Sequence, residues 1–200
     1  MLNVYFDTEF TGLHKNTTLI SIGLVAAGGE RFYAELTDYD PSQIDEWLQD
    51  NVLANLKWKT VDRNYNAPDP QAVDWDEQNN VNIHCSSKVL AKHLETWFER
   101  LIAREVVTPT GPQKIQMVSD CYAYDWVLFG DLWGHAFKVP EQVFYIPKDL
   151  STMFMDAGID PDTNREEFAE MIDGAQKHNA LWDALVIQEC HKRLTKILEK

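Results

Sequence analysis

Three strand-like segments open this chain, and a long amphipathic helix separates them from a fourth. Residues 2–7 (LNVYFD), 19–27 (LISIGLVAA) and 31–36 (RFYAEL) are rich in the β-branched and aromatic side chains that are typical of strands. Gly28 and Gly29 join the second segment to the third, and this pair accepts the positive φ of a tight hairpin turn. The beginning of the chain is therefore predicted to be an antiparallel meander.

The segment after Ser86 and Ser87 predicts a helix, because apolar residues recur on one face at steps of three and four. These residues are Val89, Leu90, Leu94, Trp97, Phe98, Leu101 and Ile102. The next apolar segment, residues 114–119, follows this helix and can therefore pair parallel with a strand of the meander. The order predicts an α/β fold with one mixed sheet, first antiparallel and then parallel, flanked by helices.

The remaining segments predict further helices around one insertion. A helix is expected from Asp40 and Pro41 through IDEWLQDNVL, with the aspartate as cap and the proline in the first turn. Residues 57–82 contain two prolines and five asparagines, which favour loop structure. The other expected helices cover about residues 124–133, closed by Gly134, then 149–157, 164–172 and 179–198.

The length and composition indicate one domain with a sizeable core, since 44% of the 200 residues are hydrophobic. No apolar run reaches the 18 residues of a membrane span, so no membrane partner is expected. Asp7 begins the first motif and leaves little room for a leader ahead of it, which predicts an unexported protein. The cysteines, three in number and without a CxxC pair, fit a reducing cytoplasm.

The formal charge of −14 argues against a broad nucleic-acid footprint, which needs clustered Lys and Arg. An enzyme that grips only a terminal phosphodiester remains compatible with this charge. Divalent cations can neutralise both its own carboxylates and the phosphate.

Five residues in three motifs form a candidate site. Asp7 and Glu9 stand in FDTEF, Asp125 in SDCYAYDWVLF, and His178 and Asp183 in HNALWD. Alternate strand residues share a face, so Asp7 and Glu9 are expected to project together. Asp125 opens a helix after the fourth strand and is near them if that strand lies beside the first.

Other interpretations of these residues stay open. Asp120 is a rival third acid because it ends the fourth strand, although it could also cap the next helix. Asp7 and Glu9 taken alone would be better explained as the solvated end of an edge strand.

His178 and Asp183 cannot face one point from inside one helix, because five residues rotate a side chain by roughly 140°. If the helix begins near Asn179, His178 lies in the preceding loop and Asp183 points in from the helix. Four carboxylates suit Mg²⁺ or Mn²⁺, and a histidine can take a proton from water at neutral pH. The set predicts metal-assisted hydrolysis of a phosphodiester.

The motifs FDTEFTGL, YDW and HNALWD resemble the DEDDh 3′-5′ exonuclease superfamily of ribonuclease H-like fold. Within it the chain is similar to ribonuclease T, oligoribonuclease and small bacterial and phage 3′-5′ exoribonuclease-like proteins. The resemblance implies two Mg²⁺ or Mn²⁺ ions per site, a single-stranded 3′ end as substrate, and a possible homodimer. It implies these roles: metal ligands Asp7, Glu9, Asp125 and Asp183, general base His178, and contacts to the terminal nucleotide from Phe10, Thr11 and Leu13.

RNA or short oligoribonucleotides are the expected substrate, with a DNA exonuclease of the same fold as the alternative. Two hypotheses come from other classes of protein. One is an inactive nucleotide or RNA-binding module, and the other is an acidic interaction protein that uses residues 57–82 as its contact surface. Phe10 and Leu13 could instead be core residues, because large apolar side chains usually serve burial.

Overall fold

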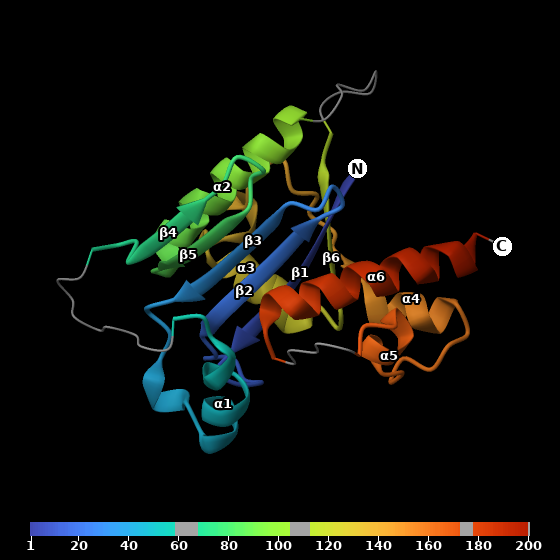
Figure 1. Cartoon of the computed structure of the whole chain (residues 1–200), viewed down its shortest axis with the longest axis horizontal. Helices are drawn as coiled ribbons and strands as arrows, with labels where there is room; N and C mark the ends of the chain where they lie inside the picture. Colours follow the sequence, from blue (N-terminus) through green and yellow to red (C-terminus); the bar gives the residue numbers. More distant parts are fainter. Residues whose placement is uncertain (59–67, 105–112, 173–177, 200) are drawn as a thin grey trace.

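A single seven-stranded sheet forms the centre of the protein (Figure 1). The structure, a computed structural model, describes residues 1–58, 68–104, 113–172 and 178–199. The strands are β1 (Leu2–Phe10), β2 (Leu19–Ala26), β3 (Arg31–Leu36), β4 (Ala72–Trp75), β5 (Val81–Cys85), β6 (Ile115–Ser119) and β7 (Lys148–Asp149). Their order in the sheet is β4-β5-β3-β2-β1-β6-β7.

Strand pairing confirms the predicted mixed sheet. The pairs β1 with β2 and β2 with β3 are antiparallel, and β6 pairs parallel with β1. β3 and β5 are also parallel. β1 is longer than expected, because its pairing with β2 continues past residue 7 to Phe10, with a bulge between Glu9 and Phe10. Asp7 and Glu9 therefore both lie within a hydrogen-bonded strand.

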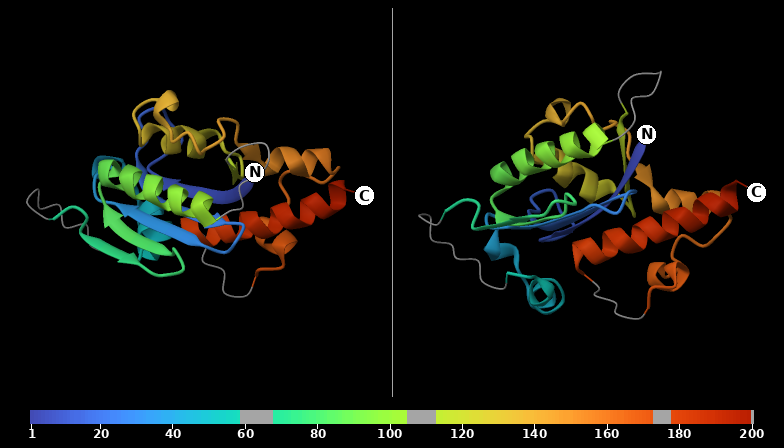
Figure 2. Two further views of the ribbon diagram at one scale, coloured as in Figure 1. Left: turned by 90° about the horizontal axis from the view of Figure 1, so that it is seen from above. Right: turned by 45° about the horizontal axis from the view of Figure 1, so that its top comes forward.

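Helices cover both faces of the sheet (Figure 2). The helices are α1 (Glu46–Asn51), α2 (Ser87–Arg104), α3 (Ala123–Asp131), α4 (Leu150–Asp156), α5 (Arg165–Ala169) and α6 (Ala180–Leu198), with 3-10 turns η1 (Pro41–Gln43), η2 (Leu53–Asn55) and η3 (Ala136–Lys138). α2 and α3 pack on one face in the main apolar core. α6 packs on β1 and β2 from the other face, where α4 and α5 complete a second core. The α/β class is thus confirmed.

The helix expected after Asp40 is divided into η1, α1 and η2. Asp40 caps η1 by accepting from the amide of Ser42, but Ile44 then adopts an extended conformation and interrupts the helical path. Asp45 is the N-cap residue of α1, and its side chain accepts a hydrogen bond from the amide of Leu48 at 2.8 Å. Two successive capping aspartates therefore explain why one long helix does not form.

The loop interpretation of residues 57–82 is wrong for Ala72–Trp75 and for the start of Val81–Cys85, which form the antiparallel pair β4 and β5. Asn79 takes the positive φ of the turn between them, so part of the asparagine signal belongs to a hairpin. Val81 and Ile83 are buried in the main core. Residues 59–67 lie outside the described residues.

The later helices begin and end near the expected positions. Gly134 and Gly158 adopt positive φ behind α3 and α4. α5 is shorter than expected because Glu170 turns to a left-handed conformation after Ala169. α6 begins just after Asn179, as predicted, and Asn179 is its N-cap. Within the described ranges, no helix has both the length and the apolar character that crossing a membrane requires.

Candidate active site

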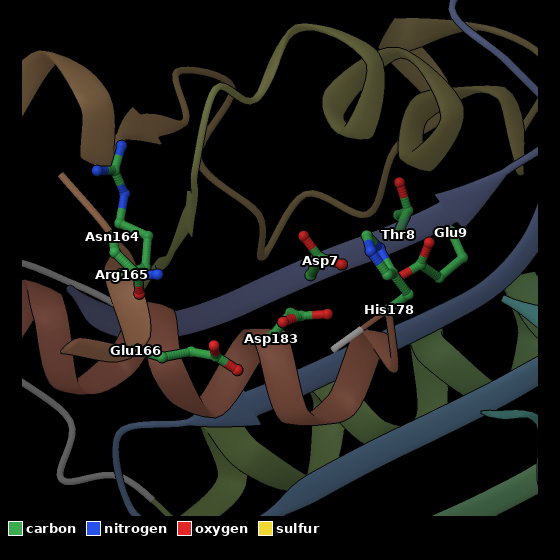
Figure 3. Close-up of a pocket in the computed structure, with 8 residues that line it drawn as sticks. All are labelled: Asp7, Thr8, Glu9, Asn164, Arg165, Glu166, His178 and Asp183. Atoms are coloured by element: carbon green, nitrogen blue, oxygen red, sulfur yellow. The ribbon is translucent and has the colours of Figure 1, made fainter. Parts of the chain in front are cut away.

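β1 presents a different kind of side chain on each of its faces. Val4 and Phe6 point into the main core under α2 and α3. Tyr5 points the other way, toward α6, and packs there with residues of the second core. Because strand side chains alternate, Asp7 and Glu9 follow Tyr5 to the α6 side. The close-up in Figure 3 shows both carboxylates there, together with Asp183.

Gly23 lets α6 approach the sheet closely enough to reach these acids. It pairs with Asp7 across β1 and β2. A Cβ atom at Gly23 would stand 2.3 Å from the backbone of Ala180 and Leu181, so only glycine fits under the first turn of α6. Asp183 lies in that first turn. The close approach therefore carries the Asp183 carboxylate toward the carboxylates of β1.

Asp7, Glu9 and Asp183 each offer a carboxylate oxygen, and these three oxygens lie within 4.8 Å of one another. The same residues line a cavity of about 400 Å³ together with His178. Divalent cations such as Mg²⁺ and Mn²⁺ prefer hard oxygen ligands of this kind. The donor set therefore fits a divalent cation.

Burial and like charges raise the pKa values of these carboxyl groups. Burial is the main cause that holds the pKa of Asp7 well above its usual range, and repulsion from Asp125, Asp183 and Glu9 adds to it. Burial also raises the pKa of Glu9 to about 8, with repulsion from Asp183 and Asp125. A bound cation would relieve this repulsion, which is a second reason why the group suits a metal.

Asp125 is not one of the three acids whose oxygens converge, but it is near enough to raise the pKa values of Asp7 and Glu9 by repulsion, and β1 itself holds it. It stands in the first turn of α3, and its Oδ1 accepts from the amide of Thr8 at 3.1 Å and from the Thr8 hydroxyl at 2.5 Å. Its Oδ2 accepts from Ser119 Oγ at 3.3 Å. Burial raises the pKa of Asp125 to about 6, although these hydrogen bonds oppose the shift. Asp125 is thus an oriented, buried carboxyl next to the cluster.

Asp120, the rival third acid, forms an ion pair with Arg165. Arg165 Nε lies 2.7 Å from Asp120 Oδ2, and Nη2 donates to Oδ1 at 3.1 Å. Ser151 Oγ also donates to this carboxylate at 2.7 Å. In Figure 3 the Arg165 guanidinium points away from the three acids. The alternative prediction that Asp120 caps the next helix is wrong, because Tyr122 is the N-cap residue of α3.

His178 lies in the turn before α6, with the cap residue Asn179 between it and the helix. It lines the cavity, so the histidine and Asp183 reach one site from different local structures. Its backbone has a φ of 60°. Its ring meets that of Trp47 from α1, with centroids 4.9 Å apart and planes at 77°. Asp173 and Gly174, which favour a loop here in the sequence, lie outside the described residues.

The three expected nucleotide contacts have different surroundings. Phe10 is half-buried and stacks on Tyr124, with ring centroids 5.5 Å apart. Thr11 is buried, and its hydroxyl bonds to Gln43 and accepts from the amide of Thr18. Leu13 is 77% exposed. Of the three, Leu13 therefore offers the most accessible surface, while the Thr11 hydroxyl ties its own loop together.

α5 and its N-cap residue Asn164 contribute cavity residues that the motifs do not indicate. Asn164, Arg165 and Glu166 line the cavity beside the acids. Glu166 accepts from the Trp182 indole at 3.2 Å, which connects α5 to the first turn of α6. Their segment has no spacing relation to the acidic motifs, so only the fold brings them to the site.

Comparison with known proteins gives one family. A 3′-5′ exoribonuclease of Mycobacterium tuberculosis strain H37Rv, Rv2179c, is 26% identical over 157 residues, which cover 78% of this chain and 76% of the relative. The corresponding protein of strain CDC 1551, MT2234.1, gives the same values. The model of the 3′-5′ exoribonuclease Rv2179c-like domain matches residues 2–195. The chain therefore belongs to this exoribonuclease family, and the enzyme class expected from the motif order is confirmed.

Proposed function

We propose that the protein is a metal-dependent exonuclease that removes nucleotides from the 3′ end of single-stranded RNA or short oligoribonucleotides. The observation that carries this proposal is the convergence of Asp7, Glu9 and Asp183, whose oxygens lie within 4.8 Å of one another in an open cavity. Family membership supports the direction and the substrate class.

Asp7, Glu9, Asp125 and Asp183 would hold two Mg²⁺ or Mn²⁺ ions. Such ions supply charge neutralisation at the attacking and leaving oxygens of an in-line displacement. The protein's part is to fix the carboxylates before substrate arrives. β1 pairing fixes Asp7 and Glu9, the first turn of α6 fixes Asp183, and the two Thr8 hydrogen bonds orient Asp125.

His178 would act as the general base that takes a proton from the attacking water. Imidazole is suited to this role because it can accept a proton at neutral pH. His178 lines the cavity from the turn before α6, whereas Asp183 lines it from the first turn of the helix. The two side chains therefore do not compete for the same helix position.

The substrate contacts we propose are Phe10, Thr11 and Leu13, at the end of β1 and in the loop behind it. Leu13 is the most exposed of them and would touch the terminal base or sugar. The formal charge of −14 favours binding of a short 3′ end over binding of a long backbone. A homodimer also stays a prediction, which analytical ultracentrifugation would test.

The test is digestion of a 5′-labelled single-stranded oligoribonucleotide with Mn²⁺. We expect a ladder of products shortened from the 3′ end, and a matched DNA oligonucleotide should be degraded more slowly. Asp183→Asn should abolish the ladder. Asp74→Asn is the matched control, because Asp74 is an exposed acid on β4 at the far edge of the sheet.

Equal rates for Asp183→Asn and the parent protein would refute the site assignment. Binding of mononucleotides without any turnover would instead identify an inactive nucleotide-binding module. Faster digestion of DNA than of RNA would move the substrate class to DNA.

A further inference from the structure

Trp47 is a half-exposed tryptophan that touches the proposed general base. It lies on α1, and 53% of its surface is exposed. Its ring meets the His178 ring almost perpendicularly, at 77° and 4.9 Å between centroids. Edge-to-face packing of this kind is favourable and directional, because the positive edge of one ring meets the negative face of the other.

The backbone of His178 needs support from its neighbours. Its φ of 60° lies in the left-handed region, which residues other than glycine seldom adopt. α1 and the following turn η2 each make one contact to the turn that contains His178. One is the Trp47 ring, and the other is a long hydrogen bond from Asn179 Nδ2 to the carbonyl of Asn55 at 3.5 Å.

α1 is itself anchored to the strands beside the site. Leu48 and Val52 pack on Ile20 of β2 in a third apolar cluster. Gln43, just before α1, bonds to Thr11 and donates to the Asn16 carbonyl at 3.0 Å, which ties the segment to the loop after β1. Trp47 stands outside this cluster, so its packing against His178 is not a by-product of core formation.

We propose that Trp47 is a positioning residue for His178, which holds the imidazole at the acidic cavity so that it can reach the attacking water. This inference rests on the proposed function, in which His178 is the general base. Trp47 itself touches neither the metal ligands nor the reacting atoms in this role. It acts through the orientation of the imidazole.

The test is a double-mutant cycle with Trp47→Ala and His178→Ala, measured by single-turnover and steady-state digestion of RNA. Trp47→Ala should lower kcat about 10- to 100-fold, the scale of a misplaced catalytic group, and change KM little. In the His178→Ala background, Trp47→Ala should cause no further loss, because the residue it positions is absent. Trp47→Phe, which keeps an aromatic ring, should recover most of kcat.

Phe137→Ala is the matched control. Phe137 is 94% exposed and also touches a histidine, His135, at 5.3 Å between centroids, but it lies apart from the acidic cavity. This variant should leave kcat unchanged. Thermal unfolding of each variant separates a folding defect from a change at the site.

Three results would overturn the inference while leaving the proposed function standing. An unchanged kcat in Trp47→Ala would show that the ring contact has no catalytic effect. An equal loss in both backgrounds would show that Trp47 acts independently of His178. A raised KM with unchanged kcat would make Trp47 a stacking surface for a substrate base. An inactive parent protein would overturn both proposals.

Discussion

The two faces of β1 are buried in different ways. On one face Val4 and Phe6 pack against the apolar side chains of α2 and α3. On the other face Asp7 and Glu9 meet Asp183 at a cavity, and burial and mutual repulsion raise the pKa values of both strand acids. The first face contributes hydrophobic stabilisation, whereas the second holds like charges close together at a cost in stability. One strand therefore joins the part that stabilises the fold to the part that we propose binds metal ions.

The largest effect is expected on the apolar face, from Phe98→Ala. Phe98 is fully buried in the main core, with its ring next to those of Trp97 and Phe129. Truncation should lower the free energy of unfolding by about 3 to 5 kcal/mol, because it removes apolar contacts and leaves a cavity. Urea unfolding measures this loss. Activity per folded molecule should stay near that of the parent, and a strong fall in kcat would break the separation between the two faces.

The acidic face should respond in the opposite way to Asp7→Asn. Loss of a proposed metal ligand should lower activity by at least about 100-fold, since even outer partners of metal ligands cost 10- to 100-fold. The free energy of unfolding of the metal-free protein should stay equal or rise, because one of the repelling carboxylates is gone. Nuclease assays and urea unfolding without metal check the two parts. Destabilisation as large as that of Phe98→Ala would contradict this contrast.

The sequence predicts the apolar face well because its signals are local. The β-branched and aromatic content of the strand segments and the helical repeat of residues 87–104 identify the strands and the helix that form the main core. β4 and β5 are not predicted as strands, because the prolines and asparagines around them favour loop structure. The pairing that makes them strands is a long-range property of the sheet.

The acidic face is predictable only where its residues belong to motifs. The shared side of Asp7 and Glu9 follows from strand periodicity, and the place of His178 before the helix follows from helix geometry. The contacts of Glu166 with Trp182 and of Trp47 with His178 join segments that no spacing rule connects. Such contacts arise where α5 packs against α6 and where α1 meets the turn before α6, which the sequence alone does not specify.

Gly23→Ala should damage both faces moderately, because Gly23 lies where α6 touches the sheet. The new Cβ would stand 2.3 Å from backbone atoms of Ala180 and Leu181, which cannot rotate away as a side chain could. Overpacking should cost about 1 to 3 kcal/mol in the free energy of unfolding, and displacement of Asp183 should lower activity as well. Gly130→Ala in α3 is the control, since nothing lies within 4 Å of its Cβ position. Equal stability and activity of both variants would refute the role of Gly23.

The smallest effect is the pH dependence that the carboxyl groups of the acidic face contribute to stability. The folded state raises the pKa of Glu9 from 4.5 to about 8 and raises that of Asp7 in the same direction. The folded protein therefore holds protons that the unfolded chain has released. Stability from these groups is fully present below their ordinary pKa values and is lost as pH rises through about 4.5 to 8.

A divalent cation should reverse this loss, because it replaces the protons as the positive charge between the carboxylates. Thermal unfolding with and without Mn²⁺ should show a larger rise in Tm at pH 8 than at pH 6, since protons compete with the metal at the lower pH. At 100 times the dissociation constant the gain would be about 2.7 kcal/mol. Asp7→Asn should weaken the rise in Tm at pH 8. Phe98→Ala should show the same rise in Tm, starting from a lower Tm without metal. An equal rise in Tm at both pH values would show that the metal does not bind through these carboxylates. The charge of the acidic face would then have no part in the proposed metal-dependent reaction.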